Sequence, residues 1–108
     1  MSRSIKYKWP DNVVFEPEAE NDFKALDHSQ RLVVFKAITK VASNPQPRPR
    51  GIGKPLSGRL TGCCKIKLRD HGIRIIYRLV PPDSDNMDVI IIGMRSDNEV
   101  YDKASERL

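Results

Sequence analysis

Cysteine, histidine, aromatic side chains and long apolar runs are all scarce in this chain of 108 residues. The two cysteines, Cys63 and Cys64, are adjacent and cannot close a disulfide loop, so we expect a reduced, cytoplasmic protein. No apolar run approaches the roughly 20 residues that cross a membrane, and the first residues lack the apolar stretch of a secretory signal. The two histidines, His28 and His71, stand apart, so neither a zinc site nor a Cys–His nucleophile is indicated. We therefore expect no metal and no other cofactor.

Positive charge is what the chain has in excess, and it is concentrated in one segment. The formal net charge is +5. Residues 48–78 hold nine Lys and Arg against one acid, Asp70, a net charge of +8, whereas residues 79–108 hold three against seven. Two interpretations are open at this point: a solvated basic face, and a surface that binds nucleic-acid phosphates.

The length allows one domain, and we expect an N-terminal arm over residues 1–11 followed by a single domain over residues 12–108. A β-rich run at residues 12–16 predicts a first strand. Apolar residues at helical spacing after Pro17 then predict a short helix. A second amphipathic helix, which Asp27 or Ser29 can cap, is predicted to end near residues 43–44. Because the break between the two helices is short, they are predicted to form a helical hairpin.

Three further strands and a helix are predicted in the second half of the chain. Residues 63–69 alternate, with Lys65, Lys67 and Arg69 on one side and Cys64, Ile66 and Leu68 on the other, so one of the adjacent cysteines is expected to point inward and one outward. A tight turn joins this strand to a strand at residues 73–80. Residues 88–94 are almost continuously apolar, which indicates a central strand buried on both faces. Ser96 or Asp97 can then cap a final short helix. The resulting order, β-α-α-β-β-β-α, predicts an α+β fold with a small, mainly antiparallel sheet, the helical hairpin on one face and a short C-terminal helix.

Residues 44–61 are rich in proline, glycine and basic side chains, so no regular element is expected there. The loop is not a known phosphate-binding motif, because Gly51 and Gly53 lack the flanking residues of a P-loop or a dinucleotide-binding turn.

Two segments of the chain resemble the RelE branch of the RelE/ParE toxin superfamily, the toxin halves of bacterial and archaeal toxin–antitoxin pairs. They are GCCKIKLRDHGIRIIYRL at residues 62–79 and VIIIGMRSDNEVYDKASERL at residues 89–108. The resemblance extends over roughly residues 12–108 and includes the L-x-G-x-L-x-G run at residues 56–62.

This resemblance implies a metal-independent endoribonuclease, an mRNA interferase that cleaves mRNA in the decoding site of the ribosome and so inhibits translation. The family's catalytic positions then fall on Lys65, Lys67, Arg74, Arg95 and Tyr101. The RNA- or ribosome-binding residues are expected to be Arg48, Arg50, Lys54, Arg59, Arg69 and Arg78. The chain departs from the family pattern at Met94, where a lysine commonly precedes the late arginine, and in a longer loop at residues 45–55, which implies a modified RNA or ribosome contact.

The chemistry implied for these residues follows from RNA itself, whose 2′-hydroxyl is the nucleophile. Neighbouring positive charges favour the neutral form of one strand lysine, which then acts as general base. Arg74 would bind the phosphate bidentately, Arg95 would do the same or protonate the leaving oxygen, and Tyr101 would orient the 2′-hydroxyl or stack a base. Taken without the resemblance, the strand cations are explained as the solvent face of an edge strand and Tyr101 as a packing residue.

The resemblance also implies partners: a cognate antitoxin protein, the ribosome and mRNA, with DNA bound only indirectly through the antitoxin complex and no membrane. An acidic, amphipathic antitoxin segment would cover the basic face or displace the C-terminal helix. Two other functions are open, a ParE-like inhibitor of DNA gyrase and a member without catalytic activity that binds only RNA or the antitoxin.

Overall fold

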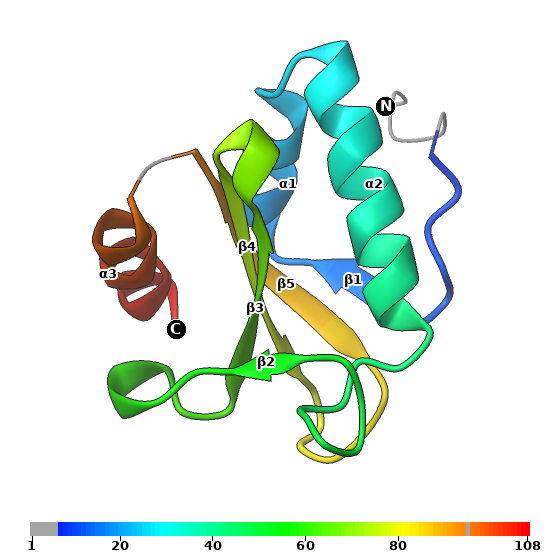
Figure 1. The fold of residues 1–108 in the computed structure, drawn as a ribbon, viewed down its shortest axis with the longest axis vertical. Coiled ribbons are helices and arrows are strands. Elements are labelled where there is room, and N and C mark those ends of the chain that lie inside the picture. Colours follow the sequence, from blue (N-terminus) through cyan, green and yellow to red (C-terminus); the bar gives the residue numbers. More distant parts are fainter. Residues whose placement is uncertain (1–6, 95) are drawn as a thin grey trace.

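A five-stranded sheet lies between two layers of helices in the computed structural model, which describes residues 7–94 and 96–108 (Figure 1). The elements in chain order are β1 (Val13–Phe15), α1 (Pro17–Lys24), α2 (His28–Ala42), β2 (Lys54–Pro55), β3 (Cys63–Leu68), β4 (Ile73–Leu79), β5 (Met87–Gly93) and α3 (Asp97–Arg107). The strands are ordered β1-β5-β4-β3-β2; β1 runs parallel to β5, and the other neighbours are antiparallel. The predicted α+β fold is confirmed.

The prediction that residues 44–61 hold no regular element is wrong. Lys54 and Pro55 form β2, which pairs with β3, and a 3₁₀ turn follows at Gly58–Leu60. A proline is tolerated here because β2 is an edge strand, where one backbone N–H is not needed for pairing. Leu60 is buried, and its burial holds the segment against the sheet.

Local capping sets the starts of two helices. Asp27 accepts a hydrogen bond from the backbone of Gln30 at 2.8 Å, and the Gln30 side chain accepts one in return from the Asp27 backbone at 3.0 Å. This reciprocal capping box starts α2. Ser96 caps α3 by accepting from the backbone of Glu99 at 3.4 Å. Of the predicted alternatives, Asp27 rather than Ser29 caps α2, and Ser96 rather than Asp97 caps α3.

Both faces of the sheet carry a core. On one face α1 and α2 cover a cluster that includes Val34, Ile38, Ile75 and Val89, and on the other face α3 covers a second cluster (Figure 1). The members of the second cluster are Leu60, Cys63, Ile76, Ile90, Ile91, Val100 and Ala104. Strand β5 is therefore buried on both faces, as its apolar run predicts.

The expectation that one of the adjacent cysteines points outward is wrong. Cys64 packs in the cluster beneath α1 and α2, and Cys63 packs in the cluster beneath α3, so both are buried. The reason is that α3 covers the face that the sequence left open.

Aromatic side chains attach the start of the described chain to the helical hairpin. The sequence predicted a polar arm over residues 1–11, but Tyr7 packs edge-to-face on Phe23 with ring centroids 5.4 Å apart. Trp9 packs on Phe15 at 4.9 Å and on Phe35 at 5.1 Å. The described part of the arm therefore extends the apolar core rather than standing away from it.

Charged and apolar contacts fix α3 at its C-terminal end and along its length. Arg107 donates to Asp22 of α1 at 2.7 Å and to the Ile90 carbonyl of β5 at 2.9 Å, and its side chain is only 11% exposed. Asp22 also accepts from the backbone N–H of Ile92 at 3.1 Å. Val100 packs directly over Gly93, where an added Cβ would lie 2.6 Å from a Val100 methyl group, so a residue without a side chain is needed at this crossing.

None of the helices in residues 7–94 and 96–108 combines the length and apolar content of a membrane span.

We expect Asp22→Ala to lower the free energy of unfolding by about 3 kcal/mol, because it leaves the largely buried Arg107 without its carboxylate. Glu18→Ala on the same helix is the matched control, since Glu18 lies 3.7 Å from Arg107 but its side chain is 67% exposed. That control is expected to change stability by less than about 1 kcal/mol. Urea denaturation measures both values, and equal losses for the two variants would contradict this account.

Candidate active site

Two cations stand opposite one another on the face of the sheet that α3 covers. Lys67 of β3 and Arg74 of β4 are directly paired across the antiparallel ladder. Strand alternation puts Lys65 and Lys67 on the same face as Cys63, which packs beneath α3. The predicted sharing of one strand face by the two lysines is therefore confirmed by the packing of their neighbours.

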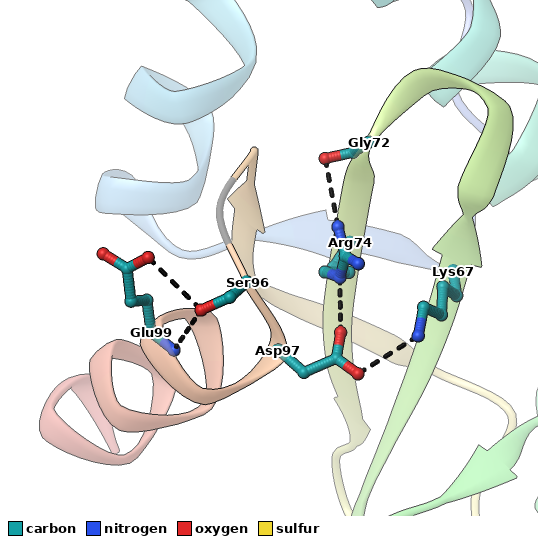
Figure 2. A network of polar contacts seen from close by, with 6 residues as sticks. All are labelled: Lys67, Gly72, Arg74, Ser96, Asp97 and Glu99. Atoms are coloured by element: carbon teal, nitrogen blue, oxygen red, sulfur yellow. Dashed lines mark hydrogen bonds and ion pairs between the residues drawn. The ribbon is translucent and has the colours of Figure 1, made fainter.

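Both cations bind the same carboxylate, that of Asp97. The Lys67 Nζ donates to Oδ2 of Asp97 at 3.1 Å, and the Arg74 Nε donates to Oδ1 (Figure 2). Arg74 is further held by a hydrogen bond from its Nη1 to the Gly72 carbonyl at 3.3 Å. Figure 2 shows the two side chains reaching Asp97 from adjacent strands. Because Asp97 is the first residue of α3 and Ser96 caps that helix, the start of α3 sets where the carboxylate lies.

The three side chains of this cluster are partly open to solvent, with exposures of 21% for Lys67, 20% for Arg74 and 35% for Asp97. The hydrogen bond from Arg74, and then that from Lys67, lower the pKa of Asp97 below its usual value of 3.8. Asp97 is therefore ionised at neutral pH. In this cluster, which we call the anion site, one ammonium and one guanidinium group hold one carboxylate near the molecular surface.

Lys65 lies beside this site without an acidic partner in the described part of the chain. It is two residues from Lys67 along β3, which corresponds to about 7 Å. On the edge side it pairs in register with Lys54 of β2, whose side chain is exposed. A second, unneutralised positive charge thus borders the Lys67–Arg74 pair.

Tyr101 lies on α3, about one helical turn after Asp97. It is half-buried and packs against the cluster beneath α3. It follows Asp97 by four residues, so both lie on the same face of the helix. The packing interpretation of Tyr101 is therefore correct for its ring, and its position also places it on the side of α3 that carries the anion site. Arg95 lies outside the described residues.

Two of the six residues expected to bind RNA are instead paired with acids of this chain. Arg59 bonds to Asp102 of α3 at 2.5 Å, with both side chains exposed, and Arg78 bonds to Asp88 at 3.2 Å. The other four side chains are exposed: Arg48, Arg50, Lys54 and Arg69.

Arg48 and Arg50 extend from a loop that is fixed to the sheet. Gln46 is buried and donates to the carbonyls of Asp83 and Ser84 at 3.1 and 2.8 Å. The Tyr77 hydroxyl donates to the Pro45 carbonyl at 2.9 Å. The two arginines therefore project from an ordered segment, which lowers the conformational entropy lost on binding a partner.

Glu16, Arg78 and Asp88 form a second charged cluster where β1, β4 and β5 meet. Asp88 is only 4% exposed; its Oδ2 accepts from Arg78, and its Oδ1 has no donor. A hydrogen bond to Asp88, then burial and the Asp88 charge, raise the pKa of Glu16 above its usual 4.5. A proton on Glu16 supplies a second donor to the Asp88 carboxylate.

Asp97 is the site residue that sequence reasoning missed, because an acid at the start of a helix is explained by capping and by the helix dipole alone. Its spacing of four residues before Tyr101 was the available signal.

Comparison with known proteins identifies the family. Residues 13–101 match the family model described as ParE toxin of type II toxin–antitoxin system, parDE. The chain belongs to this toxin family. Among curated relatives, a RelE-like toxin protein from Escherichia coli is 30% identical over 99 residues, which cover 89% of this chain and 95% of the relative. The mRNA interferase toxin RelE of Escherichia coli K12 is 28% identical over 95 residues, covering 87% and 93%.

Solved structures agree with this assignment. A double mutant of the E. coli toxin RelE in the free state superposes with a TM-score of 0.70 at 28% identity, covering 89% of this chain and 95% of that one. The same mutant bound to a peptide of the antitoxin RelB gives a TM-score of 0.64 at 28% identity and the same coverage. The resemblance to the RelE/ParE superfamily is confirmed, and the protein is a RelE-like toxin of a toxin–antitoxin system.

We expect Glu16→Gln to stabilise the toxin at pH 7. Because the pKa of Glu16 is raised in the folded state, ionisation of this group penalises folding as the pH rises from 4.5 through the folded-state value. Glutamine removes that penalty, so the gain in the free energy of unfolding should be present at pH 7 and shrink below pH 4.5. Urea denaturation at both pH values measures it, with the exposed Glu20→Gln as control. A gain of the same size at both pH values would contradict the assignment.

Proposed function

We propose that this toxin is a metal-independent endoribonuclease that cleaves mRNA in the decoding site of the ribosome and so inhibits translation. The observation that carries the proposal is that Lys67 and Arg74 converge on the two carboxylate oxygens of Asp97, at the start of α3. Lys65 is two residues from Lys67 on the same strand. The relatives named mRNA interferase RelE support the same reaction at 28% identity.

The proposed reaction uses the 2′-hydroxyl of the RNA as nucleophile. Its oxygen forms a bond to phosphorus while the bond from phosphorus to the 5′-oxygen breaks, which leaves a 2′,3′-cyclic phosphate and a free 5′-hydroxyl. Lys67 and Arg74 bind the two non-bridging oxygens and stabilise the extra negative charge of the pentacoordinate transition state. Because Lys67 and Arg74 both bind the Asp97 carboxylate, stabilising negative charge is the role that suits them best.

Proton transfers are assigned to the groups around the phosphate. The proton of the 2′-hydroxyl is assigned to Lys65 as general base, because Lys65 is the strand lysine without a carboxylate partner among the described residues. Tyr101 orients the 2′-hydroxyl or stacks a base. Arg95 is proposed as a further phosphate ligand or as the group that protonates the 5′-oxygen. With so few acid–base groups, the toxin relies on the ribosome to align the RNA for in-line attack.

The exposed cations outside the site are proposed to bind the ribosome and its RNA. Arg48 and Arg50 on the fixed loop, together with Lys54 and Arg69, leave the positive charge of the central segment available to phosphates. Arg59 and Arg78 are assigned a weaker role, because each is paired with an acid.

An antitoxin is the proposed protein partner, as in the E. coli RelE structures that contain RelB. We propose that an acidic segment of it covers the basic face or displaces α3, and that DNA is bound only through the toxin–antitoxin complex. The family description names ParE, so inhibition of DNA gyrase is the second candidate function.

We expect Arg74→Ala to slow single-turnover cleavage of mRNA on programmed ribosomes by about 100-fold or more, because one transition-state donor is lost. Lys36→Ala is the control: it removes one positive charge from the exposed side of α2, on the other face of the sheet from α3, and it should stay within about twofold of the wild type. Unimpaired cleavage by Arg74→Ala would overturn the phosphate-binding role. Intact mRNA together with loss of supercoiling by gyrase would favour the second function.

We also expect the double variant Arg48→Ala/Arg50→Ala to bind ribosomes more weakly and with a shallower dependence on salt. Each lost phosphate contact lowers the slope of log affinity against log salt by about 0.7 to 0.9. The matched control is Lys36→Ala/Lys40→Ala, which removes the same charge from the exposed side of α2. Sedimentation with ribosomes over a range of salt measures the slopes, and equal slopes for the two double variants would exclude a specific role for the loop.

A further inference from the structure

The anion site between Lys67 and Arg74 already holds an anion that belongs to the protein. Each oxygen of the Asp97 carboxylate takes one cation, Oδ2 from Lys67 and Oδ1 from Arg74. The two non-bridging oxygens of a phosphodiester carry a comparable single negative charge and require the same two donors. A phosphate added beside Asp97 would bring two anions together between the same cations, which electrostatic repulsion opposes.

We infer that the Asp97 carboxylate occupies the phosphate site of the free toxin and is exchanged for the RNA phosphate when substrate binds. This inference rests on the proposed function, because it takes the Lys67–Arg74 pair as the site of the scissile phosphate. Asp97 is then an internal competitor that holds both cations in place and lowers the apparent affinity for RNA.

The contacts of Asp97 differ from those of the other paired acids. In the described part of the chain, Asp97 is the one acid bonded to both a lysine and an arginine of the sheet. Asp102 is paired with the exposed Arg59, and the buried Asp88 is paired with Arg78. Among the described residues, Asp97 therefore alone combines two sheet cations with a side chain that is 35% exposed and can exchange with a ligand from solvent.

The fold allows this exchange without unfolding α3. Asp97 is at the first position of the helix, next to a capping bond from the Glu99 backbone to Ser96 of 3.4 Å, which is long for a hydrogen bond. The rest of the helix is held by Val100 and Ala104 in the core and by Arg107 on Asp22. A change confined to the Asp97 side chain and the first turn frees the two cations and leaves the rest of α3 in place.

If the Asp97 carboxylate exchanges with a bound anion, removing its charge should strengthen anion binding. If the free toxin is mostly in the occupied form, its apparent affinity for an anion is its intrinsic affinity multiplied by the small fraction of open molecules. Asp97→Asn keeps the size of the side chain and removes its charge, so the open fraction rises. We expect inorganic phosphate to bind Asp97→Asn about tenfold more tightly than the wild type.

The experiment titrates inorganic phosphate into the full chain and follows the Arg74 Nε–H resonance by NMR, with Asp97→Ala as a second variant. Asp102→Asn is the matched control, since it removes the same charge from the same helix but from an acid whose ion pair is with Arg59. The inference requires tighter binding for both Asp97 variants and little change for the control. Equal gains for Asp102→Asn, or binding by the Asp97 variants that is unchanged or weaker than wild type, would overturn it.

A second measurement separates this inference from the proposed function. In the wild type, phosphate should shift the carboxyl carbon resonance of Asp97 as the side chain leaves the cations, and the absence of that shift at saturation would also overturn the inference. Neither readout depends on RNA cleavage, so a toxin that leaves mRNA intact on ribosomes refutes the nuclease and not the exchange. Conversely, normal cleavage by a toxin whose Asp97 variants gain no phosphate affinity refutes the exchange alone.

Discussion

The packing of α3 across the second face of the sheet is the interaction on which the candidate site depends. It buries Cys63, Ile76 and Ile90, which would otherwise leave an apolar face in water. It also brings the start of the helix over the cations of β3 and β4, so that Asp97 reaches both Lys67 and Arg74. Because the apolar contacts and the Arg107–Asp22 bond fix the helix farther along, the polar contacts at its start can vary while the fold persists.

The uneven distribution of charge along the chain is partly cancelled in the folded protein. The acidic C-terminal third supplies Asp88, Asp97 and Asp102, and each of them bonds to cations of the basic central segment. The positive field that remains is therefore narrower than the sequence indicates, and it is centred on the fixed loop and on the outer strands β2 and β3. A partner that carries phosphates would meet a site that is preorganised but already holds one negative charge.

In this RelE-like toxin, one helix both covers the sheet and supplies the carboxylate between Lys67 and Arg74. A change in the position of the start of α3 would therefore change the charge at these two cations. Under the proposed function, the RNA phosphate takes the same two donors that Asp97 holds in the free toxin. The proposed RNA binding thus depends on electrostatics at the start of one helix.

Local sequence patterns predict the three helices and four of the five strands of the described residues in order, the capping residues to within two alternatives, and the shared strand face of Lys65 and Lys67. These features repeat with the period of a helix or a strand, or depend on neighbours a few residues away, so a local pattern is enough to predict them. The pairing of β2 with β3, the cover of the second face by α3, the burial of Cys63 and the bonds from Asp97 to Lys67 and Arg74 are visible in the fold alone. The two bonds of Asp97 link residues 23 and 30 positions apart, and they exist because apolar packing fixes the helix on the sheet, which no local pattern encodes.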